Sequence, residues 1–214
     1  MIIPRREYLR DVPLPPDLTA EAIFDALIET QKIFSLIRHE AGINLSTIVQ
    51  ANTFGGIVSN AFTKKLNDAS VYKFYSEQRY PDLMHENNTI GLEIKASNKP
   101  FKGGEGHNGH SGWHIIVCYR IFNGGDIEFT QVEIAELIGF EHVNSDWKYL
   151  GSRRNDNASQ RTETYMTNAI GTAKLRDGSV YLDPDFVDVT SALKRHRTKL
   201  VALLPIPSYS PFAD

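Results

Sequence analysis

The chain has 214 residues, of which 41% are hydrophobic, so it can bury the core of one domain. Its formal net charge of −3 excludes a uniformly basic coat protein for nucleic acid, so any contact with a polyanion would come from local basic patches. The sequence has no apolar run of about 18 residues, and residues 1–6 lack the apolar core of a signal peptide. The single cysteine, Cys118, excludes an internal disulfide and lies in an apolar run that favours a buried thiol. We therefore expect a cytoplasmic protein without a membrane span.

Two helical segments are predicted in the first third of the chain. Residues 4–18 contain four prolines and are expected to form an extended arm. Apolar side chains recur at helical spacing from residue 17 or 19 to about residue 40, and a glycine at position 42 marks the stop. A second apolar stripe predicts a helix from residue 44 or 46 to about residue 66. The pair Gly55-Gly56 favours a break within it into two shorter helices.

Strand signals dominate the middle of the chain. Residues 71–75 form a short β-type run, and residues 113–119 form a nearly continuous apolar run that suits a central strand covered on both faces. Residues 123–126 supply a hairpin turn into a further strand. The sequence Thr-Gln-Val-Glu at 130–133 matches a capping box and predicts a helix to about residue 138.

The order of these elements indicates the fold class. A further hairpin, with an Asp-Gly turn, is predicted over residues 174–182. The order helix, helix, strand, strand, strand, helix indicates an α/β protein with a central mixed β-sheet flanked by helices. No internal repeat divides the chain, so we expect a single domain over residues 1–214.

Two acidic residues and a lysine lie between the strand signals. Neighbouring side chains of a strand point to opposite faces, so Glu93 and Lys95 would share one face while Ile94 enters a core. The polar residues 85–88 predict a turn that folds the chain back and places Asp82 beside Glu93. Two carboxylates suit Mg²⁺, which takes only one or two of them from a protein and keeps waters or phosphates as its other ligands.

The sequence Pro81-Asp82 followed by Glu93-Ile94-Lys95 resembles the PD-(D/E)XK signature of the restriction-endonuclease-like nucleases. A turn between the halves, a hydrophobic strand carrying the second half and a buried strand after it fit this resemblance, which covers about residues 44–120. The resemblance implies a restriction-endonuclease-like core in which Asp82 and Glu93 bind Mg²⁺ and the Ile94 carbonyl adds a ligand. Lys95 would orient the attacking water or stabilise the transition-state charge. The alternative is a surface hairpin with a solvated Glu and Lys.

Many relatives in this family draw a further acidic residue from a preceding helix. Glu40 is one candidate for that role, because it ends the first predicted helix. Glu21 and Glu29 offer similar geometry from the sequence alone.

A glycine-rich loop at residues 99–112 precedes the central strand and is expected at the sheet end near the metal site. The histidines at 107, 110 and 114 have no cysteine partner and do not match the common structural zinc spacings, so zinc is a minor alternative. Residues 107–110 also lack the strand–helix frame of an HNH nuclease. The loop is either inert or grips phosphate or a DNA groove. In the second case its DNA-contacting residues would be Lys102, His107, Asn108 and His110.

Residues 148–176 hold six basic and two acidic side chains, a local charge of +4 in an acidic chain. Polar residues fill the gaps, so we interpret about residues 145–182 as a DNA-readout segment, contacting either base edges or only phosphates. The best candidates for DNA contact are Arg153, Arg154 and Arg161. A second basic cluster at 194–199 favours a helix end or a phosphate-facing surface over a base reader. Trp147 and Tyr165 are interpreted as packing residues in preference to stacking platforms.

The resemblance, together with the small size of the chain, predicts a Mg²⁺-dependent type II restriction endonuclease that cuts double-stranded DNA at a short specific sequence. A palindromic site would favour a homodimer, and such an enzyme is expected to work with a DNA methyltransferase of the same specificity. A repair or recombination nuclease of the same superfamily, recognising DNA structure, is one alternative. A DNA-binding regulator whose acidic pair is incidental is the other.

Overall fold

The computed structural model describes residues 3–75, 80–87, 89–101, 105–107, 109–122, 125–151 and 164–213, with only the backbone of residues 105–107. A six-stranded sheet, in the order β1-β2-β3-β5-β6-β9, forms its centre. Its strands are β1 (Tyr72–Phe74), β2 (Leu83–His85), β3 (Gly91–Ser97), β5 (Gly112–Phe122), β6 (Asp126–Leu137) and β9 (Ser179–Leu182). The β3–β5 pair is parallel and every other pair is antiparallel, which confirms the predicted mixed sheet.

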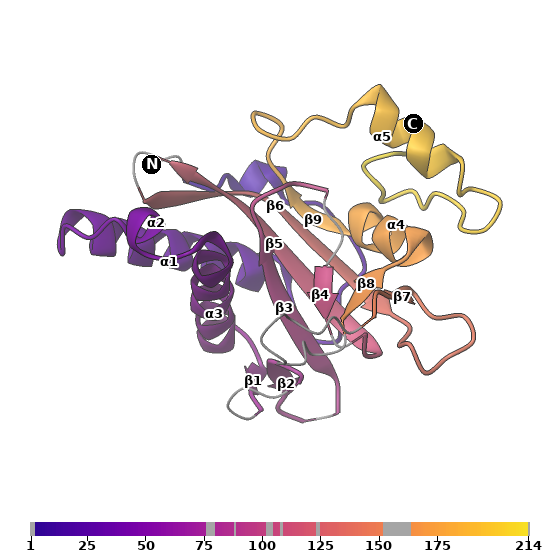
Figure 1. Ribbon diagram of the computed structural model, residues 1–214, viewed down its shortest axis with the longest axis horizontal. Coiled ribbons are helices and arrows are strands. Elements are labelled where there is room, and N and C mark those ends of the chain that lie inside the picture. The colour runs from indigo at the N-terminus through magenta and orange to yellow at the C-terminus, as the bar shows by residue number, and fades with distance from the viewer. Residues whose placement is uncertain are drawn as a thin grey trace.

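Helices and a small second sheet cover the two faces of the central sheet (Figure 1). The helices are η1 (Arg6–Tyr8), α1 (Ala20–His39), α2 (Leu45–Ile48), α3 (Ala51–Ala69), α4 (Ala169–Asp177) and α5 (Ser191–Thr198). The small sheet, in the order β4-β8-β7, contains β4 (Glu105–His107), β8 (Tyr165–Thr167) and β7 (Trp147–Tyr149). None of the helices in the described ranges combines the length and apolarity that a bilayer crossing requires.

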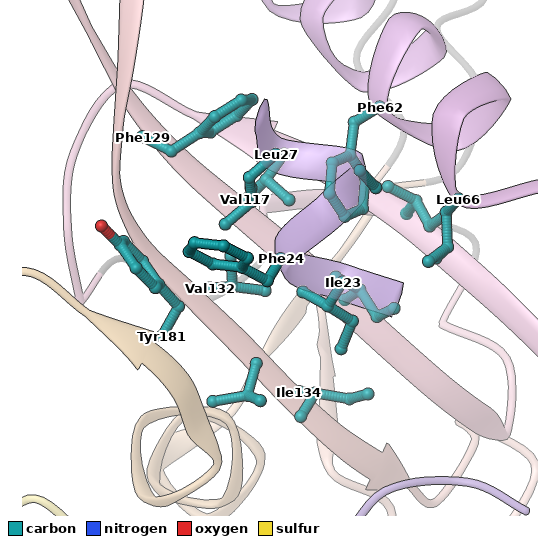
Figure 2. Close-up of a cluster of buried hydrophobic side chains, with 14 of the residues drawn as sticks. Ile23, Phe24, Leu27, Phe62, Leu66, Val117, Phe129, Val132, Ile134 and Tyr181 are labelled. Atoms are coloured by element: carbon teal, nitrogen blue, oxygen red, sulfur yellow. The ribbon is translucent and has the colours of Figure 1, made fainter. Parts of the chain in front are cut away.

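The larger hydrophobic core lies between the sheet and helices α1 and α3 (Figure 2). Phe24 and Leu27 of α1 and Phe62 of α3 are buried against alternate residues of the central strands, among them Val117 and Val132. The helical spacing of the apolar residues in each helix places them on one side, where burying such a side chain contributes about 1.5–3 kcal/mol. The first helix is confirmed, and the Thr19 hydroxyl caps it by accepting the amide of Ala22.

The opposite face of the sheet carries a smaller core with polar groups in it. Ile116, Cys118 and Leu137 pack there against Trp147 and Leu175. Because side chains alternate along a strand, the residues between them belong to the first core. The burial of Cys118 and the packing role of Trp147 are therefore confirmed.

The predicted break at Gly55-Gly56 is wrong, because α3 runs through both glycines without interruption. The break lies earlier, at Val49 and Gln50, where the backbone is extended between α2 and α3. Two glycines cost a helix only about 1 kcal/mol each relative to alanine. The burial of Phe54 and Val58 on either side of them outweighs that cost.

The predicted helix over residues 130–138 is also wrong, because this segment lies inside strand β6. The capping-box pattern is local, whereas the segment pairs with β5 on one side and β9 on the other. Val132 and Ile134 face the α1 side, and Gln131 and Glu133 face the α4 side. Paired strands on both sides satisfy the backbone better than a helix end would.

The predicted hairpin over residues 174–182 is wrong as well. Asn168 caps α4 through the amides of Ile170 and Gly171, the helix ends at Asp177, and β9 follows. Gly178 makes the junction possible, because a Cβ there would lie 1.9 Å from the carbonyl oxygen of Ile134. The Asp-Gly pair therefore ends a helix against β6 instead of forming a β-turn.

A buried ion pair ties the C-terminal part of the chain to α4. The Arg197 guanidinium of α5 donates to the Asp177 carboxylate at 2.8–3.1 Å, and both side chains are 3% exposed. Arg197 also donates to the carbonyls of Leu204 and Pro205, and the Ser210 hydroxyl donates to Asp177. Every polar partner of this pair is thus supplied by protein.

Replacing Arg197 with alanine is expected to lower the free energy of unfolding by about 3–5 kcal/mol, because Asp177 would keep a buried, unpaired charge. Urea denaturation measures the change. Lys64→Ala breaks an exposed pair with Asp68 and should change stability by less than about 0.5 kcal/mol. Equal effects of the two substitutions would contradict the role of the buried pair.

Glu133 is a buried ionisable group on the α4-side face. Its side chain is fully buried, and its Oε2 atom has no hydrogen-bond partner among the described residues. Burial raises the pKa of Glu133 from 4.5 to about 8, and the positive charge of Arg176 partly offsets this rise. The carboxyl group is therefore protonated at neutral pH in the folded protein.

Because the folded-state pKa of Glu133 is raised, its contribution to stability is present below the unfolded-state pKa and is lost as the pH rises through about 8. A pKa that differs by one between the folded and unfolded states corresponds to roughly 1.4 kcal/mol of stability. We expect Glu133→Gln to match the wild-type protein in acid and to be more stable by several kcal/mol above pH 8. Urea denaturation across this range measures the difference, with the exposed Glu86→Gln as control; parallel curves for all three proteins would refute the expectation.

Candidate functional site

The backbone pairing of β2 and β3 brings the two halves of the motif together. Leu83 is opposite Leu92, and β2 contributes no pair beyond that point, so the rest of β3 is open on this side among the described residues. Asp82, one residue before β2, fills the gap: its Oδ2 accepts the amide of Ile94 at 2.7 Å. Gly91 permits this approach, because a Cβ there would lie 2.4 Å from the Pro81 ring.

Lys95 joins the two carboxylates, as the strand alternation predicts. Its Nζ atom lies 3.9 Å from Oδ2 of Asp82 and contacts Oε1 of Glu93 directly. The Glu93 side chain is 10% exposed, whereas those of Asp82 and Lys95 are 34% exposed. Two acids and one ammonium group therefore meet at the rim of the sheet, with one negative charge in excess.

Burial raises the pKa of Glu93, the Lys95 charge lowers it, and the Asp82 carboxylate raises it again. Opposite and like charges at close range act on an ionisable group in these opposed ways. Lys95 thus helps to keep a buried carboxylate ionised. Any additional cation at the same place would favour the ionised form further.

Ile94 offers a third oxygen at this edge. The amide and carbonyl of one strand residue point to the same side, so its carbonyl faces the edge where Asp82 lies. The Ser59 hydroxyl of α3 donates to this carbonyl at 2.9 Å, and the Thr63 hydroxyl donates in turn to the carbonyl of Ser59. Helix α3 is therefore hydrogen-bonded to the residue between Glu93 and Lys95.

These oxygens fit a hard divalent cation. Asp82, Glu93 and the Ile94 carbonyl supply two carboxylates and one neutral oxygen, and Mg²⁺ takes its remaining ligands from water or phosphate. No group of three or more His, Cys, Asp or Glu side chains suited to a metal occurs in the described part of the chain. The predicted minor alternative of zinc at the loop histidines therefore has no support there, and the side chain of His107 is outside the description.

Tyr80 belongs to the site although the sequence pattern did not single it out. It precedes Pro81 through a cis peptide bond, and its hydroxyl donates to the Ser111 carbonyl at 2.5 Å. Burial raises the pKa of Tyr80 to about 12, and the negative charges of Glu93, Glu141 and Asp82 act in the same direction. This neutral hydroxyl fastens the segment carrying Asp82 to the start of β5.

His114 lies opposite Glu93 in the parallel β3–β5 pair. Burial lowers the pKa of His114 to about 4, its Nδ1 pairs with the Gly112 carbonyl at 2.9 Å, and its ring packs on Trp147. A neutral, packed imidazole beside the acids adds no positive charge to the site.

Most of the predicted DNA-contacting side chains lie outside the described residues. They are Lys102, His107, Asn108, Arg153, Arg154 and Arg161. His110 is described, and its ring lies 4.5 Å from that of Tyr80, so it borders the candidate site. The basic cluster at 194–199 forms the end of α5, as predicted.

Glu40 does not reach the acidic pair. It follows His39, whose ring contacts Asp126 at the end of β6, opposite Phe122 of β5. His114, which neighbours Glu93, is eight residues from Phe122 along β5, or roughly 26 Å. Among the described helices, Ser59 of α3 supplies a side-chain hydrogen bond to the motif, and no sequence rule marks a serine for that role.

No protein-family model, curated protein or solved structure matches the chain. The assignment of a function therefore rests on the arrangement of Asp82, Glu93 and Lys95.

Ser59→Ala is expected to weaken the binding of Mn²⁺, used as a probe for Mg²⁺, by about tenfold, because side chains that orient a metal ligand usually contribute that much. The free energy of unfolding should fall by only about 1 kcal/mol. Calorimetric titration measures the binding. Ser70→Ala at the other end of α3 removes a comparable hydroxyl bond and should leave the affinity unchanged. Unaltered Mn²⁺ binding by Ser59→Ala would remove this role of α3.

Proposed function

We propose that the chain is a Mg²⁺-dependent endonuclease with a restriction-endonuclease-like fold that hydrolyses phosphodiester bonds of double-stranded DNA. The observation that carries the proposal is the convergence of Asp82, Glu93 and Lys95 at the open edge of β3. Pro81-Asp82 and Glu93-Ile94-Lys95 resemble the nuclease signature. The first pair directly precedes β2, and the second part lies in the neighbouring strand β3 of a mixed sheet flanked by helices. This arrangement agrees with the nuclease interpretation and argues against a solvated surface hairpin.

Asp82, Glu93 and the Ile94 carbonyl would hold the divalent ion. When bound, such an ion neutralises charge on the phosphate and makes a water molecule a better nucleophile. The excess negative charge of the three side chains favours a cation at that place. Its binding would release the Lys95 ammonium group from Glu93.

Lys95 would then act on the substrate. The released ammonium group donates hydrogen bonds either to the attacking water, which fixes its direction, or to a non-bridging phosphate oxygen, which offsets developing charge. Removing one donor of this kind from an active site costs about 100–1,000-fold in rate. The neutral His114 beside it would neither repel nor replace this cation.

The DNA-binding side of the proposal draws on both the sequence and the fold. Residues 152–163, which carry Arg153, Arg154 and Arg161, connect strands β7 and β8, and Leu150 pairs with Thr164 at their base. Strands β7 and β8, which flank this segment in the sequence, pack on the face of the sheet on which Glu93 and Lys95 lie. A homodimer reading a short palindrome, with a methyltransferase of the same specificity as its partner, completes the proposal.

Plasmid or bacteriophage DNA with Mg²⁺ tests the activity. The wild-type chain is expected to give discrete fragments whose sequenced ends share one motif, and no cleavage in EDTA. Asp82→Asn and Lys95→Met should each lower the rate at least 100-fold, since they remove an ion ligand and a charge donor. Exposed residues outside the motif supply matched controls: Glu86→Gln and Lys64→Met should cleave normally.

Other outcomes select the alternatives. Nicking restricted to branched or mismatched DNA would indicate a structure-specific repair nuclease with the same site. Tight DNA binding without cleavage, unaffected by Asp82→Asn, would indicate a regulator and overturn the proposal.

A further inference from the structure

An exposed aromatic surface lies beside the small sheet and consists of Phe140, Tyr149 and Tyr165. The rings of Phe140 and Tyr165 are stacked with centroids 4.5 Å apart, and the centroids of Tyr165 and Tyr149 are 5.2 Å apart. Phe140 is 45% exposed and Tyr149 is 49% exposed. Tyr165 packs between them, as predicted, and supports two rings that remain half open to solvent.

Ring contacts connect this aromatic surface to the candidate site. Tyr80 precedes Asp82 by two residues, and its ring lies 4.5 Å from that of His110. His110 in turn lies 6.2 Å from Phe140. The rings of Tyr80 and His110 therefore connect the segment that carries Asp82 to Phe140 of the aromatic surface.

Backbone bonds hold Phe140 in place. Its amide donates to the Gly109 carbonyl at 2.8 Å, and the preceding amide of Gly139 donates to the Ser111 hydroxyl at 2.7 Å. The Ser111 carbonyl accepts the hydroxyl of Tyr80. One short segment thus fixes both the first ring of the surface and the tyrosine beside the motif, so a ligand would find the surface already ordered.

The chemistry of the surface favours planar ligands over aliphatic ones. A second aromatic path, from Tyr80 to His114 and Trp147, is buried and serves packing. The exposed path instead leaves the rings of Phe140 and Tyr149 about half open to solvent, and nucleobases stack on aromatic rings with little dependence on sequence.

We propose that the surface of Phe140, Tyr165 and Tyr149 binds unstacked bases of the DNA strand next to the scissile phosphate. The substrate class is then DNA with unpaired bases beside the cut, either present beforehand or extruded from the duplex on binding. This inference rests on the proposed nuclease function for its substrate, but it concerns a separate set of side chains.

Fluorescence anisotropy in EDTA tests the proposal without cleavage. The two probes are a labelled duplex and the same duplex with a short bulge of unpaired thymidines. The wild-type chain is expected to bind the bulged probe about tenfold more tightly for each base that stacks. Phe140→Leu combined with Tyr149→Leu keeps the surface apolar but removes the ring faces, and this variant should bind both probes equally.

The matched control keeps both rings: Phe140→Tyr combined with Tyr149→Phe should retain the preference for the bulged probe. Thermal melting of all variants checks that the Leu variant is folded. If it is not, the single substitutions Phe140→Leu and Tyr149→Leu replace it, each with a partial loss. A preference that survives removal of the rings, or no preference in the wild-type chain, overturns the inference.

Two further results separate this inference from its alternatives. In one, sedimentation velocity shows that the wild-type chain is a dimer and the Leu variant a monomer. If the DNA affinities of the two are also equal, the surface is a contact between copies and base binding is refuted. If Asp82→Asn loses Mg²⁺-dependent cleavage but the wild-type chain binds both probes equally, the nuclease function stands and only this inference is refuted. A bulge preference without cleavage of any DNA would uphold the stacking site and refute the nuclease function.

Discussion

The candidate site depends on the amide of Ile94, to which β2 gives no backbone partner. Strand β2 ends its pairing at Leu92, so the next outward-facing amide of β3 has no strand partner among the described residues. A buried amide without a partner is costly, and the Asp82 carboxylate satisfies it. The hydrogen bond that satisfies the Ile94 amide thereby holds Asp82 close to the side chain of Glu93.

The resulting cluster is costly for stability. Two carboxylates near one Lys95 leave an uncompensated negative charge, and the burial of Glu93 makes that charge more costly. Groups perturbed by both burial and a specific charge partner are typical of functional sites. The Arg197–Asp177 pair is the contrast within the same molecule, because its charges balance and its remaining donors reach carbonyl oxygens.

The sequence predicted what depends on local periodicity and missed what depends on distant partners. The alternation around Ile94 was sufficient to place Glu93 and Lys95 on one face of a strand, and the apolar run at 113–119 was sufficient to predict the central strand. The capping box at 130–133 misled, because pairing with β5 and β9 outweighs a local helix signal. Ser59 and Tyr80 reach the site through contacts 35 and 31 residues apart in the chain, which no spacing rule encodes.

Tyr80 connects the aromatic surface to the segment that carries Asp82. Its ring begins the aromatic path to Phe140, its hydroxyl holds the start of β5, and Asp82 follows two residues later. A base that stacked on Phe140 would press on a segment whose position is fixed by the same bonds that fix Tyr80. Movement of Tyr80 would shift Asp82 relative to Glu93, and displacement of a reacting group by about 1 Å can cost 100-fold in rate. The position of a base on the rings would therefore affect the position of Asp82 relative to Glu93 through a few contacts, without any larger rearrangement of the sheet.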